Sequence, residues 1–190
     1  IREGAIHDQP FFLYLPLTAP HKPVQPHPRF SGKSKLGLSG DFVMQVDWTV
    51  GQVMHSIKTA GIEKNTLLIF TSDNGSFMYR NDKNDNEDHI NDPKIQRYNK
   101  ENHTANGVLR GTKADIWEAG HRVPFFARWP EVIKPGSICT KTTAHVDLFA
   151  TCSEIVGSKL SENMAEDSFS WLSLFKGKDW EISRAPVINH

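Results

Sequence analysis

Two stretches of the chain are almost continuously apolar, and a third, between them, has apolar residues at helical spacing. Residues 10–18 (PFFLYLPLT) and 66–72 (TLLIFTS) predict strands covered on both faces, as in a parallel sheet. Residues 39–60 repeat apolar side chains every three or four positions, which predicts an amphipathic helix capped at Ser39 and stopped by Gly61. Strand, helix and strand in this order predict a parallel crossover unit, so the fold class is α/β.

The rest of the chain continues this alternation after one long interruption. Residues 77–106 are polar, rich in Asn and Asp, and without either periodicity, which predicts a long excursion over the surface. Residues 123–130 (VPFFARWP) predict a short strand, and residues 145–157 predict a helix that begins near Asp147 and ends at Gly157. Residues 185–190 (APVINH) predict the start of a last strand.

Composition narrows the partners of the protein but does not identify one. The 190 residues carry 22 basic and 22 acidic side chains, so no net field attracts nucleic acid or an anionic membrane. No apolar stretch reaches the roughly 18 residues of a membrane span. Because the sequence begins without Met and stops directly after an apolar run, we interpret it as part of a longer protein.

The two cysteines, Cys139 and Cys152, have neither zinc-site spacing nor the density of a disulfide scaffold. Free or buried thiols are the favoured interpretation, and one disulfide between them stays open.

The chemistry of greatest interest follows the second apolar run, at Asp73 and Asn74. In parallel α/β sheets, ligands bind outside the carboxyl ends of the strands, where these two side chains would lie. Their oxygens suit calcium or magnesium, and Gly75 allows the backbone to turn sharply. Asp-Asn-Gly is also an ordinary turn sequence, and the pattern alone leaves both interpretations open.

Three histidines and one lysine are further candidates. His21 follows the first apolar run in a proline-rich loop and could act as a general acid or hydrogen-bond donor, although a lone histidine in such a loop is more often a surface residue. Lys113, in LRGTK, could hold an anion as a point charge or be solvated. His121 and His190 are candidates for a substrate pocket.

Five blocks, taken in order, resemble the later part of the catalytic domain of sulfatases, which belong to the alkaline phosphatase superfamily. The blocks are FFLYLPLTAPHKP, GDFVMQVDWTVGQVM, TLLIFTSDNG, LRGTKADIWEAGHRVPFFARWP and HVDLFATCSEIVG. The similarity is greatest to bacterial arylsulfatase-like and N-acetylgalactosamine-6-sulfatase-like members. The resemblance implies an α/β fold with a mostly parallel central sheet flanked by helices. Residues 1–190 would form only part of this catalytic domain.

The resemblance also implies roles for single residues. Asp73 and Asn74 match calcium ligands, His21 matches the histidine near the leaving-group oxygen, and Lys113 matches the lysine that contacts sulfate. Sulfatases use a formylglycine made within a C-x-P-S-R motif, which the chain does not contain. Neither cysteine matches that motif, so the nucleophile is expected in a preceding segment, and the isolated chain is expected to be inactive.

The implied activity is hydrolysis of a sulfate ester in a sulfated carbohydrate or an aryl sulfate, in the periplasm or outside the cell. One alternative is a phosphodiesterase or phosphonate monoester hydrolase of the same superfamily. A two-zinc enzyme would need more His and Asp ligands than this region offers. A non-catalytic binding remnant is the second alternative.

Overall fold

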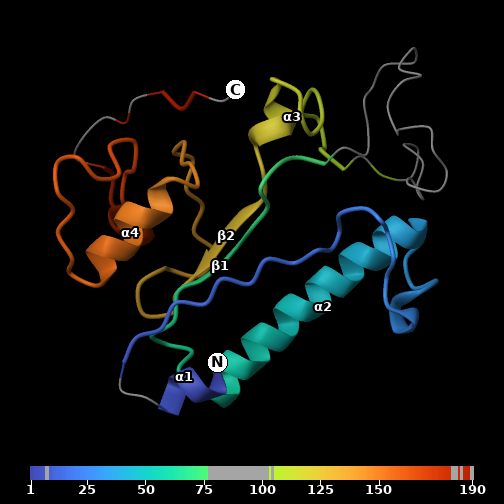
Figure 1. Ribbon diagram of the computed structural model, residues 1–190, viewed down its shortest axis with the longest axis horizontal. Coiled ribbons are helices and arrows are strands. Elements are labelled where there is room, and N and C mark those ends of the chain that lie inside the picture. The colour runs from blue at the N-terminus through green and yellow to red at the C-terminus, as the bar shows by residue number, and fades with distance from the viewer. Residues whose placement is uncertain (7–8, 77–102, 104, 181–183, 185, 189–190) are drawn as a thin grey trace. The chain divides into compact units, whose positions relative to one another are not determined.

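The computed structural model describes residues 1–6, 9–76, 103, 105–180, 184 and 186–188 (Figure 1). The chain forms two compact units, the first made of Ile1–Glu63 and Phe70–Phe126, the second of Lys64–Ile69 and Ala127–His190. Most of the predicted excursion, residues 77–106, lies outside the described residues, so that prediction stays untested.

The long helix of the first unit confirms the predicted amphipathic pattern. The unit contains α1 (Arg2–Ile6), a 3-10 turn (Pro28–Phe30), α2 (Gly37–Thr59) and α3 (Glu118–His121). Three of the predicted apolar positions of α2 are buried in the core: Phe42, Val46 and Ile57.

The predicted end of α2 is confirmed and its predicted cap is wrong. Gly61 follows the helix with a φ of +73°, which a glycine adopts without strain. The helix begins at Gly37, so Ser39 is buried inside its first turn. Asp41, 1% exposed, organises the preceding loop by accepting the backbone N–H of Gly32 at 2.8 Å and of Ser34 at 2.6 Å.

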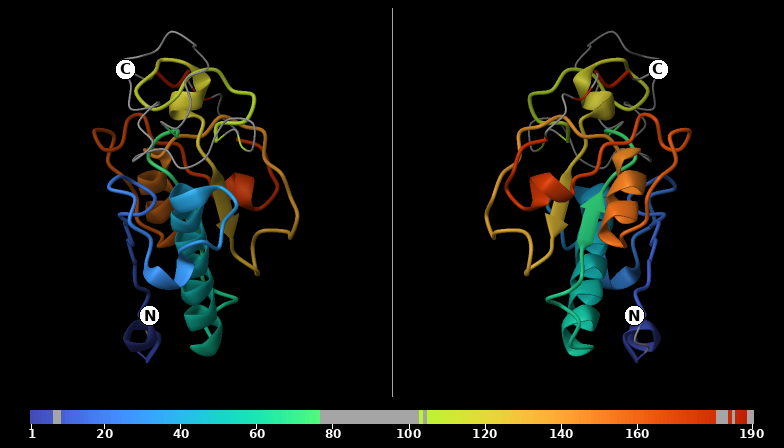
Figure 2. Two further views of the ribbon diagram at one scale, coloured as in Figure 1. Left: turned by 90° about the vertical axis from the view of Figure 1, so that its right-hand side faces the viewer. Right: turned by 90° about the vertical axis from the view of Figure 1, so that its left-hand side faces the viewer.

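Two of the predicted strands form, and they pair with each other. β1 (Leu68–Thr71) and β2 (Phe125–Arg128) make a two-stranded sheet. The rings of Phe70 and Phe126 lie 6.3 Å apart, and beyond the strands the Gly75 N–H donates to the Gly120 carbonyl at 3.0 Å. The end of β1 therefore lies beside the start of β2, which makes the pair antiparallel, as the arrows in Figure 2 show. The described residues contain no parallel pair.

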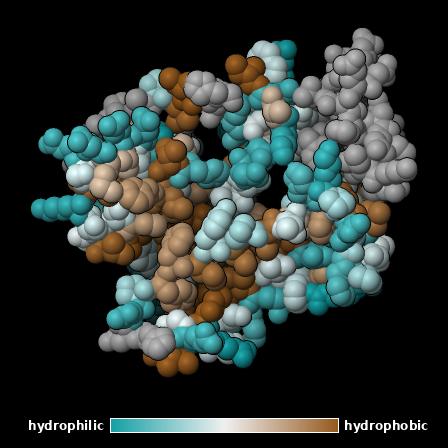
Figure 3. Space-filling view, in the orientation of Figure 1, coloured by the Kyte–Doolittle hydropathy of each residue, from teal (hydrophilic) through white to brown (hydrophobic). Residues whose placement is uncertain are grey.

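The apolar run at residues 10–18 does not form the predicted strand. The segment has no regular secondary structure, and its side chains are exposed, among them Phe12 at 70% and Tyr14 at 76%. The prediction was wrong for these residues because an apolar run indicates a need for burial but does not supply a strand to pair with. Figure 3 shows that hydrophobic residues reach the surface of the molecule in this view. Residues 186–188 also have no strand, whereas residues 189–190 lie outside the described residues.

In the second unit, α4 (Asp147–Ile155) begins where the sequence predicted, and Gly157 follows it at a φ of +71°. The short helix α5 (Leu172–Phe175) packs against α4. The carboxylate of Asp147 is fully buried and accepts hydrogen bonds from several donors: the backbone N–H of Ala144 (2.8 Å) and Phe169 (3.0 Å), the Trp171 indole (3.1 Å) and the Arg184 guanidinium.

Both cysteines are free, as the favoured interpretation of the sequence held. Cys139 is exposed, whereas partial burial raises the pKa of the Cys152 thiol.

Candidate active site

The loop that follows β1 holds the two predicted metal ligands side by side. The Asn74 Nδ2 donates to Asp73 Oδ2 at 2.6 Å, and the Ser72 hydroxyl donates to the Asn74 carbonyl at 3.0 Å. These bonds orient the amide beside an exposed carboxylate. These are hydrogen bonds of an ordinary turn, and they leave the Asp73 side chain exposed.

The side-chain oxygens of Asp73 and Asn74 are suitable ligands for a hard cation, but they are too few to complete its coordination shell. Asp73 Oδ1 and Asn74 Oδ1 make no hydrogen bond to any described residue, and carboxylate and amide oxygens are ligands that calcium accepts. Calcium takes about six to eight oxygens. Among the described residues, no group of three or more His, Cys, Asp or Glu side chains could hold a metal.

Two glycines allow the backbone of this loop to pack against the segment at α3. The Gly75 N–H donates to the Gly120 carbonyl at 3.0 Å, and a Cβ on Gly75 would come within 1.6 Å of the Ala119 carbonyl oxygen. A Cβ on Gly120 would lie 2.3 Å from the Asp115 carbonyl oxygen. Only residues without a side chain permit this approach, which brings the Asp73–Asn74 loop beside α3.

Lys113 lies at the tip of a tight turn that its neighbours fix. Thr112, 1% exposed, donates its backbone N–H and its hydroxyl to Asp115 Oδ2 at 2.8 and 3.3 Å, and the Asp115 N–H donates back to the Thr112 carbonyl at 3.0 Å. Ala114 has a φ of +70°, in the left-handed region that non-glycine residues seldom occupy. The Lys113 ammonium makes no ion pair with a described residue.

The loop of Asp73 and Asn74 and the turn of Lys113 are joined directly. The Lys113 N–H donates to the Ser76 carbonyl at 3.1 Å. The Asn106 side chain also binds Ser76, accepting its N–H at Oδ1 (3.0 Å) and donating Nδ2 to its carbonyl (2.8 Å). Sequence reasoning missed Asn106, because it assigned the residue to the end of a featureless excursion. The sequence feature that could have identified Asn106 is its position shortly before the LRGTK motif.

His21 is exposed in the proline-rich loop, as the surface interpretation expected. Its Nδ1 lies 2.7 Å from the carbonyl oxygen of Lys22, and because a carbonyl only accepts, Nδ1 is the donor. No hydrogen bond or ion pair joins His21 to another described residue of the candidate site.

His121 is the last residue of α3, next to the Gly120 carbonyl that binds Gly75. Its Nε2 is buried and has no hydrogen-bond partner among the described residues. Its place beside the loop of Asp73 and Asn74 is compatible with the predicted pocket role. His190 lies outside the described residues.

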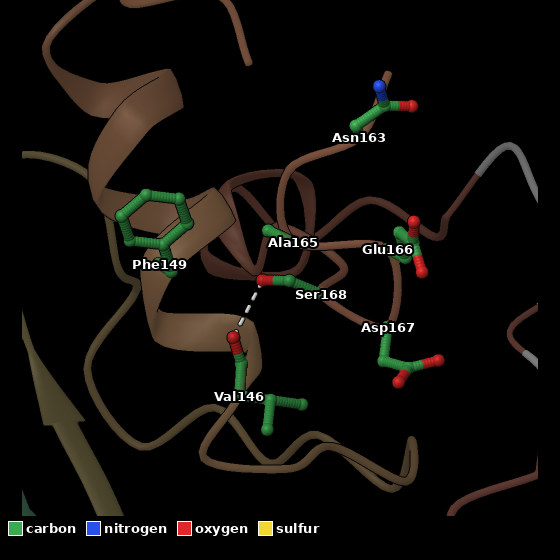
Figure 4. A pocket seen from close by; sticks show the side chains of 7 residues that line it. All are labelled: Val146, Phe149, Asn163, Ala165, Glu166, Asp167 and Ser168. Atoms are coloured by element: carbon green, nitrogen blue, oxygen red, sulfur yellow. Dashed lines mark hydrogen bonds between the residues drawn. The ribbon is translucent and has the colours of Figure 1, made fainter. Parts of the chain in front are cut away.

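An open hollow in the second unit contains none of the predicted site residues (Figure 4). It is lined by Val146, Phe149, Asn163, Ala165, Glu166, Asp167 and Ser168. Ser168 is engaged there, since its hydroxyl donates to the Val146 carbonyl at 2.6 Å. The candidate active site is therefore assigned to the joined loops of the first unit.

Comparison with known proteins identifies the class to which this fold and site belong. The family model described as sulfatase matches residues 3–158. An N-acetylgalactosamine-6-O-sulfatase of Bacteroides thetaiotaomicron is 39% identical over 173 residues, which are 91% of this chain and 32% of the relative. A steryl-sulfatase of Rattus norvegicus is 34% identical over 172 residues, 90% of this chain and 27% of the relative.

Solved structures agree with the sequence comparison. One, from work on the metabolism of multiple glycosaminoglycans by Bacteroides thetaiotaomicron, superposes with a TM-score of 0.75 at 38% identity, covering 90% of this chain and 34% of the other. Another, Ps i-CgsB in complex with k-i-k-neocarrahexaose, gives a TM-score of 0.74 at 25% identity, covering 93% and 36%. The chain belongs to the sulfatase family, and its fold is that of the alkaline phosphatase-like sulfatases.

The chain spans about a third or less of the length of the curated relatives that it matches. Within the described residues, no helix combines the length and the apolar character needed to cross a membrane.

Proposed function

We propose that the complete protein is a sulfuric ester hydrolase, arylsulfatase-like, that removes sulfate from a sulfated carbohydrate or an aryl ester. The observation that carries this proposal is the hydrogen-bonded junction of two loops, one bearing Asp73 and Asn74 and the other bearing Lys113. The junction holds the backbones of the two loops together, so we infer that oxygens of Asp73 and Asn74 would bind a cation close to where the Lys113 ammonium would bind an anion. Membership of the sulfatase family favours a sulfate ester over a phosphate diester as the substrate.

Asp73 and Asn74 would hold calcium together with ligands from parts of the protein outside this chain. Bound there, calcium would supply positive charge to the sulfate oxygens and to an oxygen nucleophile. We expect that nucleophile to be a formylglycine in a segment outside this chain. The neutral amide of Asn74 binds a cation without adding negative charge, which leaves the site able to accept an anionic substrate.

Lys113 would bind the sulfate group and offset the charge that grows on its oxygens in the transition state. The turn around it is held by hydrogen bonds of Thr112 and Asp115, so its backbone needs little reorganisation during the reaction. The net charge of this chain does not attract the substrate, because its acidic and basic residues are equal in number. Attraction of the sulfate therefore depends on local groups.

His21 would donate a proton to the departing alcohol oxygen. Because its Nδ1 donates to the Lys22 carbonyl, only Nε2 is available to the substrate. Nε2 carries a proton in that arrangement only when the ring is an imidazolium. His121, whose Nε2 has no hydrogen-bond partner among the described residues, would line the substrate pocket together with His190.

The remaining expectations concern the whole protein. We propose that the complete protein has a mostly parallel central sheet, whose further strands come from the rest of the catalytic domain. We propose a periplasmic or extracellular location, because sulfated polysaccharides occur outside cells.

The proposal is tested by replacing Lys113 with alanine in the full-length protein and measuring sulfate release from a chromogenic aryl sulfate. Losing this charge should lower kcat by about 10²–10³-fold, the magnitude typical of removing one group that stabilises a transition-state oxyanion. Lys134→Ala, at an exposed lysine of the second unit, is the matched control and should keep wild-type kcat. Wild-type protein that hydrolyses an aryl phosphate diester but releases no sulfate would contradict the proposal.

A further inference from the structure

The side chain of Asn106 forms two hydrogen bonds with the backbone of Ser76, one as acceptor and one as donor, as a neighbouring strand would. Its Oδ1 accepts the N–H of Ser76 at 3.0 Å and its Nδ2 donates to the carbonyl of the same residue at 2.8 Å. The second hydrogen of Nδ2 reaches the Gly111 carbonyl at 3.3 Å. The amide therefore uses its acceptor and both of its donors, and it joins two segments that are 35 residues apart in the sequence.

The two segments are the ones that carry the candidate ligands. Ser76 is two residues after Asn74, and Gly111 is two residues before Lys113. The Ser76 carbonyl that accepts from Asn106 also accepts the Lys113 N–H at 3.1 Å. One carbonyl group thus ties the backbone of the lysine to the loop of the candidate metal ligands, and Asn106 donates to the same carbonyl.

Only an amide supplies this set of bonds. A carboxylate at position 106 could still accept the Ser76 N–H, but it would place negative charge against the carbonyl oxygens of Ser76 and Gly111. A hydroxyl side chain offers a single donor and cannot serve both carbonyls. The chemistry of the contact therefore distinguishes asparagine from its closest analogue in shape.

We infer that Asn106 is a positioning residue of the active site, which sets the distance between the cation held by Asp73 and Asn74 and the ammonium of Lys113. The inference rests on the proposed function. Both charges must contact one sulfate group, so a shift of the Lys113 turn would weaken the transition state more than the bound substrate. A displacement of about 1 Å in such a group can lower the rate by about 10²-fold.

The test compares Asn106→Ala and Asn106→Asp with the wild type in the full-length protein, at a temperature well below each melting point. We expect kcat for an aryl sulfate to fall by about tenfold or more while KM changes by less than about threefold. The calcium concentration giving half of the maximal thermal stabilisation should rise in both variants. Asn65→Asp, the same chemical change at an exposed position before β1, should leave all three quantities unchanged.

A double-mutant cycle tests whether Asn106 acts through the lysine. In the Lys113→Ala background, Asn106→Ala should cause little further loss of kcat, because the group that it positions is already absent. A purely structural residue would lower the melting temperature of the single variant but would leave its kcat per folded molecule and its calcium response unchanged. That result, or a full independent loss in the double variant, would overturn the inference.

Failure of the proposed function gives a different result. Wild-type protein that releases no sulfate would remove the proposed function, and with it the catalytic role of Asn106. Hydrogen exchange of the Ser76 and Lys113 amides in the same proteins then decides whether the connection itself exists. Both amides should exchange faster in Asn106→Ala than in the wild type or in Asn65→Asp, and equal rates in all three would show that the connection is absent.

Discussion

At the scale of single residues, the site depends on backbone groups that approach closely because side chains are missing. Gly75 and Gly120 allow the loop after β1 to touch the segment at α3, and Asn106 adds a side-chain amide to the same contact. The sequence predicted Asp73, Asn74 and Lys113 as candidates, because strand ends and short motifs mark them. It could not predict Asn106, because one hydrogen-bonding amide leaves no periodic signal.

Replacing Gly75 with alanine tests the close approach. The added methyl group would meet the Ala119 carbonyl oxygen at 1.6 Å, so the backbone must move and the bond to Gly120 must lengthen. We expect the free energy of unfolding to fall by about 1–3 kcal/mol, the usual effect of overpacking, together with a loss of sulfatase turnover. Denaturant titration and kcat measure the two effects.

Gly51→Ala is the matched control for this change. Gly51 lies inside α2, and a Cβ there meets nothing within 4 Å. That substitution should raise the free energy of unfolding by up to about 1 kcal/mol, because alanine favours a helix more than glycine does. Equal stability of Gly75→Ala and the wild type would contradict the packing of the two loops.

At the scale of elements, the periodic patterns predicted the helices and short strands well and the pairing of strands poorly. The helices α2 and α4 and the strands β1 and β2 form where apolar spacing placed them. The run at residues 10–18 does not form a strand. The hydrophobicity of a segment indicates that it should be buried, but it does not indicate which segment will cover it. Pairing direction is likewise a property of two segments, and β1 and β2 are antiparallel although their sequences suit a parallel sheet.

The start of α4 depends on one buried carboxylate. Asp147 is 0% exposed, and it binds the nearly buried guanidinium of Arg184, whose side chain is 9% exposed. Asp147→Ala would leave this guanidinium without its partner and would remove the acceptor of the Trp171 indole. We expect the free energy of unfolding to fall by about 3–5 kcal/mol, as is usual when one member of a buried ion pair is removed.

Asp167→Ala, at an exposed aspartate of the same unit, should change stability by less than about 0.5 kcal/mol. Chemical denaturation of the full-length variants measures both changes. Similar midpoints for the two variants would show that Asp147 does not organise this unit.

At the scale of the whole molecule, the chain is about a third of the length of its curated relatives and carries part of the residues that the proposed reaction needs. The balanced charge of the chain gives no long-range attraction for an anion. The central claim is that Asp73, Asn74 and Lys113 form one calcium-dependent site for a sulfate ester.

Sulfate release by the full-length protein, measured against free calcium for the wild type and Asp73→Asn, tests this claim most directly. The substitution keeps the shape of the side chain and removes its charge, so it should weaken calcium binding without unfolding the protein. We predict that chelation abolishes turnover in the wild type, that added calcium restores it, and that Asp73→Asn needs a far higher calcium concentration. Turnover that is indifferent to chelation, or an identical calcium response in the two proteins, would contradict the claim.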